Sequence, residues 1–231
     1  MKLLATASHL RRTRVGTIPQ PRTTFACLIA IALLGQPFSA QAQRAGSVGG
    51  CDIRRGTLCT NANLNGAQLA GVNLANSQFT RSDLSGADLS GATLSEANFS
   101  STELAGTNFN GASMQRINLR NARLTNATLV EADLRNAVLQ NAVLTEADLS
   151  GARLANADLT NARLEGARLD KADLQRANLR AAKLKGASLA GANLQGAILT
   201  RAVLVDVDLS GANLDQAIFL NAQTDGCTGC P

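Results

Sequence analysis

The chain has 231 residues, of which 22 are Lys or Arg and 17 are Asp or Glu, giving a formal net charge of +5. It contains six Phe, no Trp and no Tyr, which argues against nucleic-acid binding by base stacking on exposed aromatic side chains. The single histidine is His9, so the rest of the chain lacks the commonest general base of enzymes.

Residues 1–42 have the composition of a secretory signal peptide. An apolar run extends from Phe25 to Leu34, and a small-residue segment ends at Ala42. The run is too short to span a bilayer comfortably. We therefore expect export to the periplasm or the outside of the cell, cleavage after Ala42 and no transmembrane segment in the mature chain. The basic residues that precede the run are Lys2, Arg11, Arg12, Arg14 and Arg22.

Other interpretations of the N-terminal region stay open. The Arg11-Arg12 pair is compatible with twin-arginine export, although Thr13-Arg14 continues that motif poorly. One alternative is that the basic segment stays on the mature protein as a disordered arm. Another is that translation starts at a later residue than Met1. Residues 48–51, Val-Gly-Gly-Cys, faintly resemble a lipoprotein cleavage site, but the apolar run ends well before them.

Charge does not point to a nucleic-acid partner once the leader is set aside. The leader holds five basic residues and no acidic one, so 17 residues of each sign remain. Within this neutral remainder, residues 116–201 hold 13 basic and 8 acidic residues, whereas residues 202–231 hold four acidic residues and no basic one. The high isoelectric point is thus a property of the leader.

From Leu64 to Phe219 every fifth residue is large and apolar, and 27 of these 32 residues are Leu. The residue two positions before each of them is small, and it is Ala in 25 of 32 cases. A helix turns by about 100° per residue, so residues five apart do not share a face. In an extended chain, residues two apart point to the same side. Pairs such as Ala62 and Leu64 are therefore expected to face inward together on short strands.

The chain must turn between one strand and the next. The step from Leu64 to Ala67 is three residues long and breaks the alternation of an extended chain. The second residue after each central apolar residue is Gly or Asn in 20 of 32 repeats, and these residues tolerate positive φ best. The sequence therefore predicts coils of short strands and tight corners, each coil pairing with the next about 4.8 Å away.

The pattern resembles that of the pentapeptide-repeat proteins, as in residues 87–91, Ala-Asp-Leu-Ser-Gly, and residues 192–196, Ala-Asn-Leu-Gln-Gly. The resemblance covers residues 61–222. It implies an all-β fold, a right-handed quadrilateral parallel β-helix with four repeats per coil, so that 32 repeats make about eight coils. Residues 20 apart would then stack, which places Phe79 over Phe99.

The segments that flank the repeat, residues 43–60 and 223–231, are expected to form an N-terminal cap and a C-terminal cap or tail. Bridged cysteines need Cα atoms within about 7 Å of each other, whereas the two ends of such a solenoid lie tens of ångströms apart. This predicts a disulfide within each flanking segment and excludes a zinc site made of all four cysteines. A redox role for the C-terminal pair lacks the fold context that it needs. The two expected pairs are Cys51–Cys59 and Cys227–Cys230.

The same register predicts charge ladders and one apolar patch on the outside. Opposite charges should stack between Glu96 and Arg116, Glu103 and Arg123, Asp133 and Arg153, Arg153 and Asp173, Asp148 and Arg168, and Glu165 and Lys185. A possible interface lies near the C-terminal end, where apolar residues replace polar ones, unless the tail folds over it. Its residues are Ile198, Val203, Val205, Ile218 and Leu220.

No catalytic, cofactor-binding or metal-binding residues are predicted, because no shielded pair of carboxylates, nucleophile with a base, or phosphate-binding loop is recognisable. We expect no enzyme activity and no small-molecule substrate. The favoured hypothesis is an exported rigid scaffold that binds a protein, with a possible homodimer through the C-terminal end. Mimicry of DNA that blocks a type II topoisomerase is the second hypothesis, and the neutral charge opposes it. Binding of nucleic acid or another anionic polymer through Arg163, Lys183 and Lys185 is the third.

Overall fold

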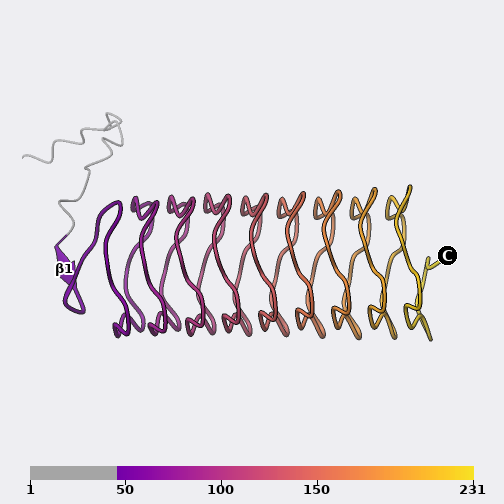
Figure 1. Ribbon diagram of the computed structural model, residues 1–231, viewed down its shortest axis with the longest axis horizontal. Coiled ribbons are helices and arrows are strands. Elements are labelled where there is room, and N and C mark those ends of the chain that lie inside the picture. Colours follow the sequence, from indigo (N-terminus) through magenta and orange to yellow (C-terminus); the bar gives the residue numbers. More distant parts are fainter. Residues whose placement is uncertain (1–45) are drawn as a thin grey trace, which may run out of the picture. The chain divides into compact units, whose positions relative to one another are not determined.

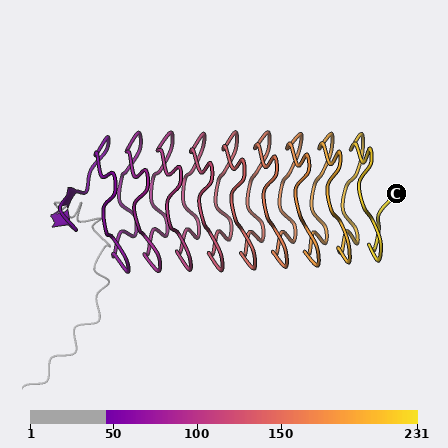
Figure 2. The ribbon, with the colours of Figure 1, turned by 60° about the horizontal axis from the view of Figure 1, so that its bottom comes forward.

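The computed structural model describes residues 46–231, and the predicted signal peptide lies outside these residues. Residues 46–231 form a straight column of stacked coils that runs from the indigo to the yellow end of the ribbon (Figure 1; Figure 2). Parallel bridges join residues 20 apart at every fifth position, from Leu58 with Gln78 to Asp208 with Thr228. The chain is therefore a right-handed, four-sided parallel β-helix, as predicted.

Backbone hydrogen bonds join each coil to the next in a fixed pattern. The N–H of Leu64 donates to the carbonyl of Asp83 at 2.7 Å, and the N–H of Asp83 donates back to the carbonyl of Ala62 at 2.9 Å. Within the coil, the N–H of Ala67 donates to the carbonyl of Leu64 at 3.0 Å and closes the turn. Because this pattern recurs every five residues, the strands need no length beyond a single bridge each.

The corners adopt the positive φ that the sequence predicts. Asn76 has φ 60° and Gly86 has φ 65°, and the same region is occupied by residues of other types, such as Glu96 at φ 61° and Ala181 at φ 53°. One corner residue therefore adopts the left-handed backbone conformation in every repeat, whether or not its residue type favours that conformation. The stacking of the coils, more than the corner residue, dictates this geometry.

The interior is solid. The central residues from Leu74 to Leu204 and nearly all the small residues beside them are fully buried. The rings of Phe79 and Phe99 stack with their centroids 4.8 Å apart, which confirms the predicted aromatic column. Close packing of this kind fills the column with Leu and Ala side chains along its length.

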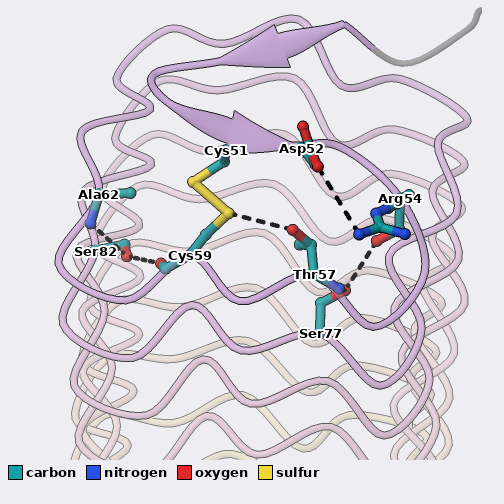
Figure 3. Close-up of a disulfide and its surroundings, with 8 residues drawn as sticks. All are labelled: Cys51, Asp52, Arg54, Thr57, Cys59, Ala62, Ser77 and Ser82. Carbon is teal, nitrogen blue, oxygen red and sulfur yellow. Dashed lines mark hydrogen bonds and ion pairs between the residues drawn. A yellow bond between two sulfur atoms is a disulfide. The ribbon is translucent and has the colours of Figure 1, made fainter.

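The N-terminal end is covered by a short antiparallel hairpin, β1 (Ser47–Val48) and β2 (Cys51–Asp52). Its turn lies directly on the first coil, since a Cβ added to Gly49 would meet the carbonyl oxygen of Asn63 at 2.4 Å. Ile53 is buried beneath the hairpin, and Val48 packs against the same core. A disulfide joins Cys51 to Cys59 with a Cα–Cα distance of 5.6 Å (Figure 3).

The C-terminal residues continue the column instead of closing it. Gln223 pairs with Val203, and Thr228 pairs with Asp208, so the tail adds a further partial coil. At the other end, Leu58 already pairs with Gln78, and the bridge ladder thus extends beyond residues 61–222 on both sides. The second disulfide joins Cys227 to Cys230, so both pairings match the prediction.

Candidate interaction surface

The polar residues of the flat faces form hydrogen bonds that hold the turns. The side chain before each central residue is often Asn or Asp, and its oxygen accepts the N–H of the residue two positions later. Asp83 accepts from Ser85 at 2.9 Å, and Asn98 accepts from Ser100 at 3.0 Å. The backbone hydrogen bonds between and within coils provide no acceptor for this N–H. The Asn or Asp that precedes the central residue of many repeats therefore has a structural role, which the periodicity alone did not reveal.

Asp133 shows how firmly these carboxylates are engaged. Hydrogen bonds from the Arg135 guanidinium lower the pKa of the Asp133 carboxyl to about 2, although burial opposes the shift. The side chain of Gln115 donates a further hydrogen bond at 2.7 Å. Hydrogen bonds from Ser85 likewise lower the pKa of Asp83. A carboxylate that stays ionised and occupied in this way is suited to holding a fold and poorly suited to proton transfer.

Four of the predicted charge contacts are present. Arg116 pairs with Glu96, and the other nitrogen–oxygen distances are 3.5 Å for Arg123 with Glu103, 3.7 Å for Arg153 with Asp133 and 3.7 Å for Arg168 with Asp148. The arginine side chains of these ladders are exposed, and each pair contributes a few tenths of a kcal/mol to about 1 kcal/mol.

The other two predicted pairs stack as expected but form no ion pair among the described residues. Glu165 instead pairs with Arg163, two residues away in the chain, at 3.4 Å and accepts a hydrogen bond from Thr145 at 3.3 Å. Arg153 is held by Asp133, and among the described residues it forms no ion pair with Asp173. Glu165 pairs within its own coil and Arg153 pairs with the preceding coil, and spacing alone does not predict which of the available partners forms the ion pair.

No functional centre for chemistry stands out. Within residues 46–231, no group of three or more His, Cys, Asp or Glu side chains is placed to hold a metal ion. Across the same residues no buried polar side-chain atom lacks a hydrogen-bond partner. The part of the chain that the structure describes also contains no helix that could cross a membrane. The informative features are two surfaces near the C-terminus.

The first surface is the open C-terminal end of the column. Leu214 and Phe219 occupy central positions of the last coil, yet they are half-exposed, whereas their counterparts in the first coil are buried. Ala212, Ala217 and Ala222 are half-exposed as well. Among residues 46–231, the N–H groups of Leu214 and Phe219 have no backbone acceptor. We define these five residues as the open end.

The second surface lies on the side of the column and contains the predicted interface residues. Ile198 pairs with Ile218 across adjacent coils, and the N–H of Arg201 donates to the carbonyl of Leu220 at 2.9 Å. Leu220 is 63% exposed and Ile218 is 48% exposed, whereas the other three residues are half-buried. The tail does not fold over them, because it continues the coil. This apolar patch consists of Ile198, Val203, Val205, Ile218 and Leu220.

Four cations adjoin the apolar patch directly. Lys183 pairs with Val203 across one coil step, and the N–H of Gly186, next to Lys185, donates to the carbonyl of Val205 at 2.9 Å. All four cations are exposed, and the described part of the chain offers them no ion-pair partner. We define Arg180, Lys183, Lys185 and Arg201 as the basic edge.

Comparison with known proteins agrees with this architecture. The family model of pentapeptide repeats matches in eight copies that together cover residues 57–221. QnrB1, described as a plasmid-mediated fluoroquinolone resistance protein, is similar in structure with a TM-score of 0.60 at 20% identity, covering 74% of this chain and 89% of that one. At this identity the likeness shows the fold alone.

A second solved structure is more similar in sequence. HetL, a pentapeptide-repeat protein involved in heterocyst differentiation regulation in the cyanobacterium Nostoc, is 33% identical over 74% of this chain and 88% of that one, with a TM-score of 0.38. No curated protein matches the chain. The repeat model spans well over half of the sequence, and the observed column has the coil that such repeats form. The chain belongs to the pentapeptide-repeat family.

Proposed function

We propose that this protein is an exported, non-enzymatic scaffold that binds protein partners, and that it pairs with a second copy of itself through its open end. A solid interior leaves no room for a substrate, and the carboxylates of the faces are engaged in turn and ladder hydrogen bonds. A column stabilised at every coil holds its outer side chains at fixed spacing, which suits recognition of another rigid surface.

The exposure of the open end is the observation that carries the proposal. The edge of a solenoid presents unpaired backbone groups together with core side chains, and such edges tend to associate unless they are covered. Leu214 and Phe219 combine both features. Four carboxylates lie close to this end, so two copies that meet there repel each other at low ionic strength. They are Asp206, Asp208, Asp215 and Asp225.

Sedimentation equilibrium of the purified chain tests self-association. We expect a dimer in the micromolar range that tightens as salt is added, because salt screens the acidic residues. Phe219→Gln should give a monomer, because it places an amide in the centre of the contact. Leu58→Gln is the matched control, since Leu58 is an exposed apolar residue at the opposite end. A wild-type chain that stays monomeric at every concentration and salt level overturns the pairing.

Export is tested separately. Fractionation of the native cells followed by N-terminal sequencing should find the protein outside the cytoplasm with Gln43 as its first residue. Recovery from the cytoplasm with an intact leader contradicts this part of the proposal.

Inhibition of a type II topoisomerase is the second candidate function, because the resemblance to the pentapeptide-repeat family implies it. A mimic of DNA needs a dense row of negative charge, because DNA carries one charge every ~1.7 Å. In this chain, several acidic residues of the faces pair with basic ones, as in the pair of Asp148 and Arg168, and others stack on uncharged residues, as Asp158 does on Asn178. We therefore expect no effect of the purified protein in a supercoiling assay, and inhibition at low micromolar concentration would reverse the order of the two candidates.

A further inference from the structure

We propose that the basic edge and the apolar patch act as one surface that binds an anionic lipid bilayer at the level of its headgroups. This goes beyond the scaffold function and does not depend on self-association, because the surface lies on the side of the column and not at its open end. The proposal rests on an unequal distribution of cations and on the apolar residues that adjoin them.

Free cations are concentrated in one part of the column. Sixteen Arg and Lys residues lie within residues 46–231, and seven of them form ion pairs. Of the remaining nine, six fall between Lys171 and Arg201, a segment of about one and a half coils. Elsewhere the ladders neutralise charge, whereas here they do not. The six are Lys171, Arg176, Arg180, Lys183, Lys185 and Arg201.

The ion pair that Glu165 forms with Arg163 explains part of this excess of unpaired cations. Stacking places Glu165 one coil below Lys185, where it would neutralise the lysine. Glu165 instead pairs with Arg163 at 3.4 Å and accepts a hydrogen bond from Thr145. Lys183 likewise pairs across the ladder with Arg163 on one side and Val203 on the other, so no acidic residue adjoins it along its column. Neither lysine therefore forms an ion pair within residues 46–231, and both are exposed.

Each cation of the basic edge has an apolar residue one or two coil steps away. Lys183 is followed in its column by Val203, and Lys185 is followed by Val205. Arg180 lies two residues from Asn178, whose column continues through Ile198 to Ile218. A coil step is about 4.8 Å. Apolar side chains and ammonium or guanidinium groups thus lie within several ångströms of each other, which is the depth over which a membrane surface changes from headgroup to hydrocarbon.

The apolar component favours a lipid surface over a soluble polyanion. A polyphosphate or an acidic polysaccharide would be bound by the cations alone and would leave Ile218 and Leu220 in water. A nucleic acid would gain from stacking on exposed aromatic rings, and this surface has none because Phe219 belongs to the open end. A bilayer uses both kinds of side chain, since cations contact phosphate groups while aliphatic tips enter the interface.

The geometry of the surface and the nearby acidic residues bear on how it would meet a bilayer. The surface covers two adjacent sides of the column and the corners at both ends of the side that carries Lys183 and Val203, so this side can lie along a planar bilayer. Asp206 follows Val205 at the same corner, where its carboxylate lies over Gly226, and the N–H of Asp206 donates to the carbonyl of Asp225 in the next coil. These carboxylates therefore adjoin the surface at the corner of Lys185 and Val205, and binding should orient the column with the other corner, at Arg201 and Leu220, closer to the lipid.

Vesicle co-sedimentation with the full-length protein tests the proposal. The probes are vesicles of phosphatidylcholine alone and vesicles in which about one third of the lipid is phosphatidylglycerol. We expect binding to the anionic vesicles only, decreasing as salt rises. Lys183→Glu with Lys185→Glu should lower the partition coefficient more than about 20-fold, and Ile218→Ser with Leu220→Ser should lower it about tenfold. All variants carry the same residues 1–45, so any contribution of that segment is common to them.

Matched controls separate a defined surface from general attraction. Lys171→Glu with Arg176→Glu makes the same change in net charge at other corners of the column, and we expect less than about a threefold effect. Phe219→Gln should bind vesicles like the wild type. Equal losses in the two charge variants, or unchanged binding of the Ile218→Ser, Leu220→Ser variant, overturn the proposal. So does binding to polyphosphate or duplex DNA without binding to anionic vesicles, which would assign the edge to a polymer.

Discussion

The two ends of the column differ in how their terminal coils are covered. A hairpin, a disulfide and a set of buried hydroxyl groups close the N-terminal end, whereas the C-terminal end stops with its last coil exposed. The difference is visible in one column of the interior, where Phe79 is fully buried and Phe219 is half-exposed. The core side chains are therefore shielded at the N-terminal end and accessible at the C-terminal end, which is the difference on which the proposed self-association rests.

Hydroxyl groups at small positions are a second difference between the ends. The buried polar residues of the described chain all lie near the N-terminus, and beyond Thr107 nearly every small position is Ala. Ser82 accepts the N–H of Ala62 at 3.0 Å and donates to the carbonyl of Cys59 (Figure 3). The side chains thus bond backbone groups of the first coil, and no such group serves the last coil.

The largest effect is expected from the pair Phe79→Ala and Phe219→Ala. Phe79 is enclosed and stacks on Phe99, so its removal leaves a cavity and should cost about 3–5 kcal/mol of unfolding free energy. Phe219 should cost about 1–2 kcal/mol, because part of its ring is already in water. Chemical denaturation at low protein concentration measures both. Equal losses would mean that the C-terminal end is covered in solution, and the comparison of the ends would fail.

The disulfides should differ in the same direction. Replacing both Cys51 and Cys59 by Ala opens a link across 8 residues that anchors the hairpin, and we expect a loss of about 2–3 kcal/mol. The link between Cys227 and Cys230 spans 3 residues at an end that frays by itself, so its removal should change global unfolding by less than about 1 kcal/mol. Denaturation with and without reductant provides an independent check, since reduction of the wild type should reproduce the larger loss.

The sequence predicts the repeating part of the molecule well because one physical rule applies at every fifth residue. The alternation of Ala62 and Leu64 indicates what faces inward, and the step of 20 residues then predicts the stacking of Phe79 on Phe99. The cysteine pairs followed from the length of the column. The same rule does not predict the contacts of long side chains, since Glu165 can reach either Arg163 or Lys185 and forms its ion pair with Arg163.

The ends could not be predicted as completely, because they depart from the repeat. The hairpin of β1 and β2 depends on a Gly49-Gly50 turn that fits on Asn63, and no periodic signal announces that contact. The tail was expected to cap the column or to cover the apolar patch, but Gln223 and Thr228 simply continue the ladder. Thr224 takes a central position there that Leu would otherwise hold, and this polar residue conceals the last repeat in the sequence.

Removal of one buried hydroxyl sharpens the comparison further. Ser82→Ala leaves the N–H of Ala62 without its acceptor, and we expect a loss of about 1–2 kcal/mol in urea denaturation. Ser90→Ala is the matched control, because Ser90 uses only its backbone N–H to bond Asp88 and should change stability by less than about 0.5 kcal/mol. If both variants unfold at the same urea concentration, the hydroxyl groups do not seal the N-terminal end.

The smallest effect concerns pH and compares the middle of the column with its open end. Hydrogen bonds from Arg135 lower the pKa of Asp133 to about 2, from the ordinary value of 3.8 that an aspartate has in an unfolded chain. The resulting stability is present above pH 3.8 and is lost as pH falls toward 2, so the wild type should lose about 1–2 kcal/mol that Asp133→Asn no longer shows. Hydrogen bonds from Ser210 also lower the pKa of Asp208, but Asp208 is only half-buried and has no arginine partner among the described residues. Asp208→Asn should therefore leave the pH profile of unfolding nearly unchanged, and a change as large as that of Asp133→Asn would show that the last coils are packed as tightly as the middle ones.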